Sequence, residues 1–281
     1  MRIRCWGARG SIPVSGPEYL KYGGDTTCVE VRATAGDIII IDAGSGIRRL
    51  GGQLVAEGAT EMDLLFTHAH WDHLLGFPFF KPLYRPGVAV RVFGSPFAQK
   101  TIQQMLSETM SRPNFPVPLE EVHADVSFHE SGDCPGPLNL GGVTVVATVL
   151  SHPDRGLGYK FIEGGRAFVF LTDNELGLQH PGGGTFDDYV GFCAGADLLI
   201  HDAEFAPEEY EHTRGWGHST WADALALALR AGVKSLGLYH HNQDRTDEEV
   251  DAFVASCRGR IARENAELEC FAVSHETQRR L

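Results

Sequence analysis

Short hydrophobic runs recur along the chain between turns that are rich in glycine and proline. Runs of about four to eight residues with many branched and aromatic side chains predict β-strands. Ten strands are predicted, at 1–6, 28–32, 37–41, 62–67, 88–93, 143–149, 167–171, 198–201, 236–239 and 268–273.

Longer segments predict helices, and two of these carry a clear start signal. Thr220 with Asp223, and Thr246 with Glu249, match the capping pattern of a hydroxyl residue followed three positions later by an acid. Because strands outnumber helices and come in two series, the pattern favours an α+β fold of two sheets packed face to face with helices outside. The helices are predicted at 46–57, 96–111, 186–193, 220–231 and 247–261.

The composition suits a single domain over residues 1–281, because 43% of the residues are hydrophobic. The longest aliphatic block, 38–41, is far too short to span a membrane, and residues 1–11 lack the apolar run of a secretory signal. Six cysteines are scattered without a CxxC pair, which is typical of reduced thiols. We therefore expect a cytoplasmic protein with no membrane partner and mostly buried, inert cysteines. Whether it forms a homodimer stays open.

The charge bears on the partners of the protein. The formal net charge is −13, and the basic doublets, 48–49 and 279–280, form no larger Lys/Arg cluster. Proteins that bind nucleic acid through phosphate contacts usually carry a basic face or tail. We therefore expect that nucleic acid is not a partner and that the substrate is small.

The most informative motif is the run Thr67-His68-Ala69-His70-Trp71-Asp72-His73, which follows the hydrophobic run 64–66. Alternate side chains of an extended segment face the same way, so His68 and His70 could grip one metal ion. The turn that follows would aim Asp72 and His73 at a second ion. The alternative is a polar loop whose histidines bond to backbone or water, and the further ligand candidates below argue against it.

Three further candidates each follow a β-like run: His152, Asp173 and His240. Strand ends at one edge of a sandwich converge in space, so these residues can join the motif. His152 would complete the first ion with His68 and His70, His240 would join Asp72 and His73 on the second, and Asp173 could bridge the two.

With these residues in place, the chain resembles the metallo-β-lactamase superfamily from residue 6 to about residue 247. The resemblance implies a four-layer αββα sandwich and a dinuclear hydrolase that holds two divalent ions, zinc in the first instance and manganese as the alternative. The phosphodiesterase branch, with tRNase Z and the cyclic-nucleotide phosphodiesterases, is the most similar. The segments that carry this likeness are HxHxDH at 68–73 and those at 41–44, 150–152, 158–159, 172–173, 199–203, 217–220 and 238–240.

Departures from the family pattern narrow this assignment. Asp173 stands where lactamases of the superfamily place a thiolate, and His70 stands where the diiron branch usually has Glu, so neither activity is expected. The tRNA-processing enzymes carry a long RNA-gripping arm between the third His and the bridging Asp, yet only twenty residues separate His152 from Asp173. The family's His-Glu-Ala-Thr segment is changed to His-Asp-Ala-Glu at 201–204.

These considerations predict a metal-dependent phosphodiesterase whose substrate is a small phosphodiester, with a cyclic nucleotide as the first choice. Asp72 is expected to ligate the second ion and to accept a proton from the attacking water, and His218, oriented by Asp202, to donate a proton to the leaving sugar oxygen. For His218 the alternative is a helix-start residue bonded locally beside Thr220. For the whole chain the alternatives are a tRNase Z-like RNA endonuclease and a non-catalytic, metal-bound sensor.

The aromatic segment 76–84 directly after the metal motif is a second candidate for substrate choice. Its rings could stack a nucleobase. Equally, they could belong to the core or to a dimer surface.

Overall fold

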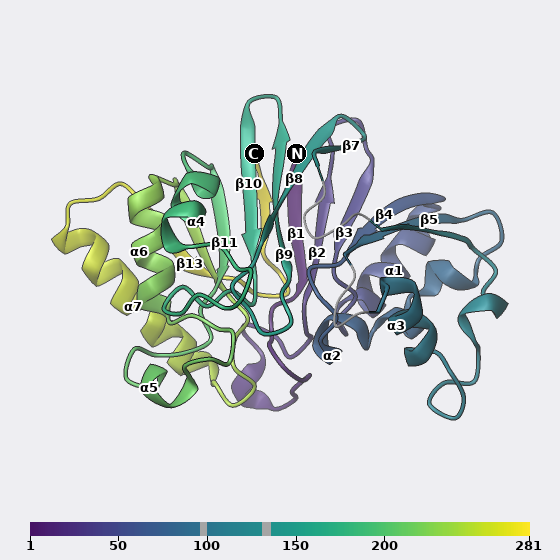
Figure 1. Ribbon diagram of the computed structural model, residues 1–281, viewed down its shortest axis with the longest axis horizontal. Coiled ribbons are helices and arrows are strands. Elements are labelled where there is room, and N and C mark those ends of the chain that lie inside the picture. Colours follow the sequence, from purple (N-terminus) through teal and green to yellow (C-terminus); the bar gives the residue numbers. More distant parts are fainter. Residues whose placement is uncertain (96–99, 131–135) are drawn as a thin grey trace.

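The computed structural model describes residues 1–95, 100–130 and 136–281 of the chain, and these form two seven-stranded sheets. The chain up to residue 130 builds one sheet with its helices, and the chain from residue 138 builds the other, except that the last strand, β14 (Gln278–Arg280), pairs in the first sheet (Figure 1). The predicted α+β sandwich is confirmed.

The first sheet is antiparallel at one side and parallel at the other. β14, β1, β2 and β3 pair antiparallel, and β3 to β6 run parallel. In spatial order its strands are β14 (Gln278–Arg280), β1 (Arg2–Gly7), β2 (Cys28–Arg32), β3 (Ile38–Ile41), β4 (Glu61–Leu65), β5 (Ala89–Gly94) and β6 (Asp125–Glu130).

The second sheet repeats this plan. β7 to β10 pair antiparallel, and β10 to β13 run parallel. Its strands, in spatial order, are β13 (Glu269–Ala272), β12 (Ser235–Tyr239), β11 (Leu198–Asp202), β10 (Arg166–Leu171), β9 (Leu157–Glu163), β8 (Val143–Val149) and β7 (Leu138–Leu140).

Helices cover the outer face of each sheet. On the first sheet lie α1 (Ile47–Glu57), α2 (Trp71–Leu74) and α3 (Ile102–Thr109), and with the second sheet lie α4 (Phe186–Cys193), α5 (Tyr210–Thr213), α6 (Trp221–Ala231) and α7 (Asp247–Arg263) (Figure 1). Short 3-10 helices occur at η1 (Pro17–Tyr19), η2 (Phe77–Phe79), η3 (Lys81–Tyr84) and η4 (Leu119–Glu121).

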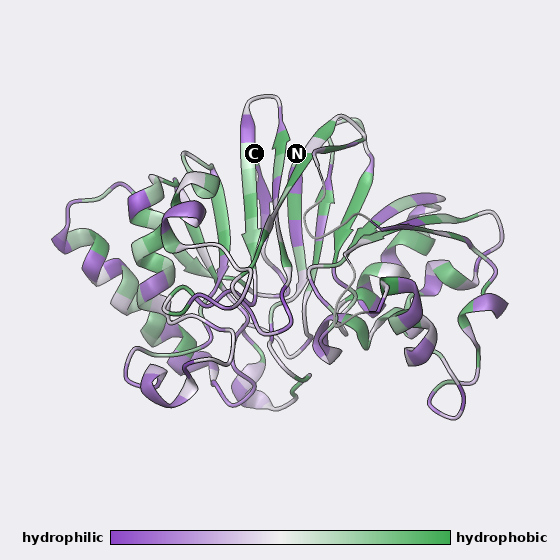
Figure 2. Cartoon of the chain, in the orientation of Figure 1, coloured by the Kyte–Doolittle hydropathy of each residue, from purple (hydrophilic) through white to green (hydrophobic). Residues whose placement is uncertain are grey.

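Three hydrophobic clusters separate the four layers. The side chains of β3 alternate between two of them: Ile39 and Ile41 face the cluster between the sheets, and Ile38 and Ile40 face the cluster under α1. The third cluster lies under α4, α6 and α7. Hydrophobic residues accordingly predominate in the strands, and hydrophilic ones in the loops and on the outer helix surfaces (Figure 2).

The predicted helix starts at Thr220 and Thr246 are confirmed, since both threonines accept a hydrogen bond from the N–H of the acid three positions on. Helix 96–111 is shorter than predicted, because Thr101 caps α3, and residues 96–99 lie outside the described part. Four strands were not predicted: β6, β7, β9 and β14. Five cysteines are buried and unpaired, and Cys134 lies outside the described residues. Among the described residues, no helix is long and apolar enough to cross a membrane.

Candidate metal centre

The ligand candidates lie where strands end at one edge of the sandwich. Motif 67–73 follows β4, His152 follows β8, Asp173 follows β10 and His240 follows β12. Parallel strands of one sheet end at the same edge, and the two sheets bring their edges together here. Residues that are far apart in sequence therefore meet.

Three residues at these strand ends adopt an unusual backbone conformation. Asp42, Asp173 and His240 have φ values of 61°, 54° and 57°. The left-handed region costs a residue with a side chain on the order of 1–3 kcal/mol, and such strain concentrates at functional sites. The turns after β3, β10 and β12 are therefore retained at a cost to stability, which is consistent with a site at this edge.

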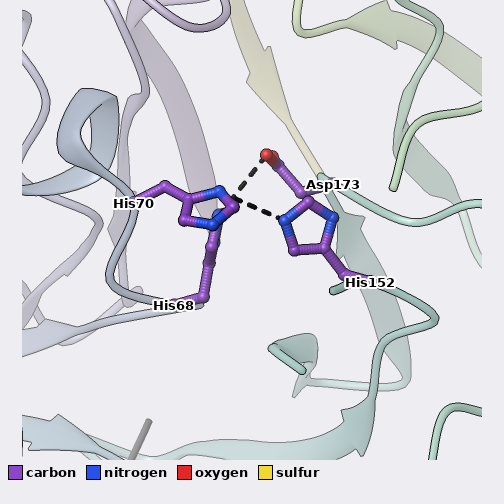
Figure 3. Close-up of side chains that lie close together, drawn as sticks. All are labelled: His68, His70, His152 and Asp173. Atoms are coloured by element: carbon purple, nitrogen blue, oxygen red, sulfur yellow. Dashed lines mark hydrogen bonds and ion pairs between the residues drawn. The ribbon is translucent and has the colours of Figure 1, made fainter. Parts of the chain in front are cut away.

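Four side chains form a first group: His68, His70, His152 and Asp173. One nitrogen or carboxylate oxygen from each lies within 4.8 Å of all the others. The side chains point toward one another, with His152 Nε2 3.2 Å from His70 Nδ1 and His68 Nε2 3.5 Å from Asp173 Oδ2 (Figure 3). This spacing allows all four to contact a single ion.

A second group lies beside the first and consists of Asp72, His73 and His240. Asp72 Oδ2 lies 3.3 Å from His73 Nε2 and 3.2 Å from His240 Nε2. Asp173 also reaches this group, because its Oδ1 lies 3.4 Å from His73 Nε2 and its Oδ2 lies 3.3 Å from His240 Nε2. Asp173 therefore stands between the two groups, where a bridging carboxylate would be needed.

The chemistry of this cluster fits two metal ions. Imidazole nitrogens and carboxylate oxygens suit zinc, manganese and iron. Within the described part of the chain, the buried Nε2 atoms of His68 and His73 have no hydrogen-bond partner, although buried polar atoms are normally satisfied. Both atoms face the carboxylates of the cluster, so a cation between them would satisfy both. The cluster is thus compatible with a dinuclear centre.

Without a metal ion, protonated imidazoles neutralise the negative charge of the buried carboxylates. Burial opposes ionisation of Asp173, but His240 and His73 outweigh it and hold the pKa of this carboxyl well below its usual range. Burial also opposes protonation of His73, yet the charges of Asp72 and Asp173 raise its pKa well above the ordinary value. Metal ligands must be deprotonated, so a bound cation would displace such protons and replace them as counter-charge.

Each of three ligand candidates is oriented through its second ring nitrogen. His73 Nδ1 donates to Asp42 Oδ2 at 2.8 Å, and His240 Nδ1 donates to Glu204 Oε2 at 3.0 Å. His152 Nδ1 donates to the carbonyl of Gly217 at 3.0 Å. These bonds leave Nε2 of each ring facing the cluster, as is usual for metal-binding histidines.

Two glycines make room for ligand rings. A Cβ on Gly10 would lie 2.4 Å from the His240 ring, and one on Gly217, which has a φ of +96°, would lie 1.9 Å from His152 Nδ1. No side chain fits in either place without displacing a ring.

His218 lies beside the cluster and is paired with Asp202. Its Nδ1 donates to Asp202 Oδ2 at 2.6 Å, and its ring stacks on that of His240 with centroids 4.7 Å apart. Burial disfavours its charged form, but Glu204 and Asp202 more than compensate and raise the pKa of His218 to about 9. The pair of His218 and Asp202 is therefore present as the sequence indicates, with Nε2 of His218 left free of Asp202.

Two buried carboxylates that contact residues of the site were missed by the sequence analysis. Glu204 touches both His240 and His218, whose Nδ1 lies 3.3 Å away. Glu175 is buried and accepts hydrogen bonds from the N–H groups of Gly215 and Gly217, which fixes the loop that leads to His218. A signal existed for both, since each lies two residues after a candidate acid that ends or follows a strand.

The histidine next to His240 and the aromatic segment 76–84 lie away from the cluster. His241 Nε2 donates to the carbonyl of Val273, so its side chain turns away from that of His240. In segment 76–84, Phe77 and Phe80 are buried in the core, and the exposed Phe79 packs edge-on against Phe115. The core interpretation of this segment therefore holds for its two buried rings.

Known proteins share this architecture. A model of the Beta-lactamase superfamily domain matches residues 38–241. A ribonuclease Z of Bradyrhizobium sp. (strain ORS 278) is 30% identical over 263 residues, which cover 76% of this chain and 83% of that protein. Among solved structures, human tRNase Z, short form, has a TM-score of 0.64 at 20% identity, covering 88% of this chain and 95% of that one. YhfI of Bacillus subtilis, a metallo-beta-lactamase fold protein, has a TM-score of 0.68 at 17% identity, covering 99% and 98%.

The expectation that nucleic acid is not a partner is wrong, because the similar proteins include ribonucleases Z. The net charge of −13 was a poor guide for a physical reason. It counts every acid of the chain, including those that would hold cations, and it omits the positive charge that such cations would place at the cluster.

Proposed function

This chain belongs to the metallo-β-lactamase superfamily, in the branch of metal-dependent phosphodiesterases, and from that premise we propose that it hydrolyses a phosphodiester bond of RNA. The similarity to ribonuclease Z over most of both chains supports RNA as the substrate. The observation that carries the chemistry is the His218–Asp202 pair, which lies directly against the candidate metal ligand His240.

Most residues of the site would bind metal, and two would transfer protons. His68, His70 and His152 would hold one ion, Asp72, His73 and His240 the other, and Asp173 both. Bound divalent cations, zinc or alternatively manganese, would neutralise the phosphoryl oxygens and lower the pKa of the attacking water. Asp72, whose Oδ2 accepts a hydrogen bond from the N–H of Ser11 at 3.0 Å, would accept a proton on the attacking side.

His218 is the candidate acid for the leaving oxygen. Since its Nδ1 is held by Asp202, only Nε2 can deliver a proton to a substrate. The short bond to Asp202 also keeps the ring in one orientation, so the tautomer and the direction of proton transfer are set before substrate binds.

A second candidate function is hydrolysis of a small phosphodiester such as a cyclic nucleotide. The observation that favours it is the short connection from His152 to Asp173, which consists of a tight loop followed by β9 and β10. In the tRNA-processing enzymes that this chain resembles, an RNA-gripping arm would be inserted there.

The two candidates are separated by a substrate panel at fixed enzyme concentration. A 3′-extended tRNA precursor, an unstructured oligoribonucleotide and cyclic AMP are each incubated with the zinc-loaded, the manganese-loaded and the chelator-treated protein, and the metal content is measured by elemental analysis. We expect RNA cleavage that needs metal, with close to two ions per chain. Turnover of cyclic AMP alone would replace the first proposal by the second, and turnover of no substrate by a protein with two ions would refute both.

A further inference from the structure

Two tryptophans next to the metal centre are exposed to solvent. Trp71 is 60% exposed and Trp216 is 62% exposed, whereas Trp6 is 3% exposed and lies in the core. Tryptophan gains much from burial, and an exposed ring leaves an apolar face free for contact with a ligand. Both rings occur in segments that supply residues to the site.

The chain places both tryptophans at the edge of the cluster. Trp71 stands between the ligand candidates His70 and Asp72, at the first position of α2. Trp216 precedes Gly217, whose carbonyl accepts the hydrogen bond from His152, and lies two residues before His218. Each tryptophan is therefore within two residues of a residue of the site.

Trp216 is also held in place. Its ring packs edge-on against Phe205, with centroids 6.3 Å apart and an interplanar angle of 76°. Phe205 in turn packs edge-on against His218 at 6.1 Å. A ring that is braced along an edge and still largely exposed is suited to stacking a flat partner, because little conformational entropy is lost on binding.

The two rings come from opposite halves of the molecule. Trp71 belongs to the half that supplies the 67–73 motif, and Trp216 belongs to the half that supplies His218 and His240. A phosphodiester has an organic group on each side of the phosphorus, and in RNA each group carries a base. Two aromatic platforms beside one phosphate site match that arrangement.

We propose that Trp71 and Trp216 stack the two nucleobases that flank the scissile phosphate, so that the site takes unpaired RNA. This inference rests on the proposed function and names its substrate more closely. Stacking acts between ring faces at contact distance, so it does not depend on the overall charge of the protein. Every base has a stackable face, so we also expect little base preference.

The test compares two substrates that differ in their bases. One is a dinucleoside monophosphate, with a base on each side, and the other is the same ribose–phosphate–ribose unit without its bases, which has no aromatic ring. A stacked base contributes a factor of about 5 to 150 in binding. Trp71→Ala and Trp216→Ala should therefore each raise KM for the dinucleotide by about that factor more than for the abasic substrate, and Trp71→Phe or Trp216→Phe should restore most of the loss.

The matched control is Phe79→Ala, since Phe79 is 55% exposed but already contacts Phe115. It should change the two KM values equally. If the tryptophan variants changed KM equally for the two substrates, the proposal would be overturned. A rise in KM for the dinucleotide alone in Phe79→Ala would instead assign base stacking to segment 76–84.

A binding measurement keeps this test independent of turnover. Uridine 5′-monophosphate should quench the fluorescence of the protein more than ribose 5-phosphate does, and the difference should shrink in both tryptophan variants. If wild-type protein with either metal hydrolyses neither substrate, the proposed function fails, and quenching alone then decides the stacking. Equal quenching by the two compounds would refute it.

Discussion

Strands β10, β11 and β12 carry buried carboxylates at both ends, and the two ends neutralise them in opposite ways. At the amino ends, Asp197 lies directly before β11 and accepts hydrogen bonds from Arg166 at 2.9 Å and Lys234 at 2.8 Å. Arg166 begins β10 and Lys234 lies directly before β12, so Asp197 is paired with a basic side chain from each neighbouring strand.

At the carboxyl ends of the same strands, imidazoles take the place of these bases. Asp173 follows β10, Asp202 ends β11 and His240 follows β12. The ion pairs recorded for Asp173 and Asp202 are all with histidines, within the ranges that the structure describes.

The difference separates structural acids from functional ones. Lys and Arg keep their charge at neutral pH, so an acid paired with them is permanently balanced. An imidazole can lose its proton and become a metal ligand, so an acid paired with histidine can exchange a proton for a metal ion. The carboxyl end is thus suited to binding cations, whereas the ion pairs at the amino end join neighbouring strands.

The largest expected effect comes from removing the acid between the two ligand groups. Asp173→Ala should lower kcat/KM by more than about 10³-fold and should lose both ions, because the carboxylate that offsets repulsion between two dications disappears. Activity assays and elemental analysis measure this. Asp197→Ala, an equal truncation at the other end of the same sheet, is the control and should keep its metal. A variant lacking Asp173 but retaining two ions would show that Asp173 is not the bridge.

His218→Ala should separate proton transfer from metal binding at the carboxyl end. Metal content should stay at the wild-type level while kcat for an RNA ester falls by about 10²- to 10⁴-fold, the usual contribution of a general acid. Bis-p-nitrophenyl phosphate is the control substrate, because its leaving group needs no proton and should suffer far less. Equal losses on both substrates would reduce His218 to a phosphate-binding or structural residue, and loss of metal would place it among the ligands.

Glu204→Gln tests whether an acid that touches no proposed ion directly still belongs to the functional end. The variant weakens the acceptor for His240 Nδ1, and such partners of metal-binding histidines typically contribute about 10- to 100-fold in metal affinity. Competition with a chelator should show a loss of that size, and added zinc should restore activity. An unchanged metal affinity would mean that Glu204 serves His218 alone.

The sequence predicted which side chains converge at this edge better than it predicted the groups that hold them. A His or Asp that follows a hydrophobic run is a local signal, and His68, His70, His152, Asp173 and His240 all carry it. The hydrogen bond from His152 to the carbonyl of Gly217 joins residues 65 positions apart. No sequence pattern near either residue indicates that this particular carbonyl is the partner.

The missed strands have a similar explanation. β14 consists of the polar residues Gln278, Arg279 and Arg280, so no hydrophobic pattern predicts it. Its pairing with β1 holds it in the sheet. β6 lies at a sheet edge and is mostly exposed, and β9 includes Gly158 and Lys160 within its run. Pairing with a neighbouring strand, rather than intrinsic pattern, decides these elements.

The smallest expected effect lies at the amino end and concerns stability alone. Burial opposes ionisation of Asp197, but hydrogen bonds from Lys234, the N–H of Ala167 and Arg166 outweigh it and lower the pKa of the carboxyl to about 2. Because the folded pKa lies below the unfolded value, the ionised carboxylate stabilises the fold above about pH 4. That contribution is lost as the pH falls from about 4 to about 2.

Asp197→Asn should therefore lower the free energy of unfolding by about 1 to 2 kcal/mol at pH 7, where the two basic partners are largely exposed and screened. Urea unfolding of metal-free wild type and variant, repeated at pH 7, 5 and 3.5, measures the difference. The gap should be constant from pH 7 to 5 and smaller at 3.5, while metal content and RNA cleavage at pH 7 stay at the wild-type level. A gap that widens toward low pH would reverse the sign of the linkage, and a loss of metal in this variant would show that the two strand ends are not independent.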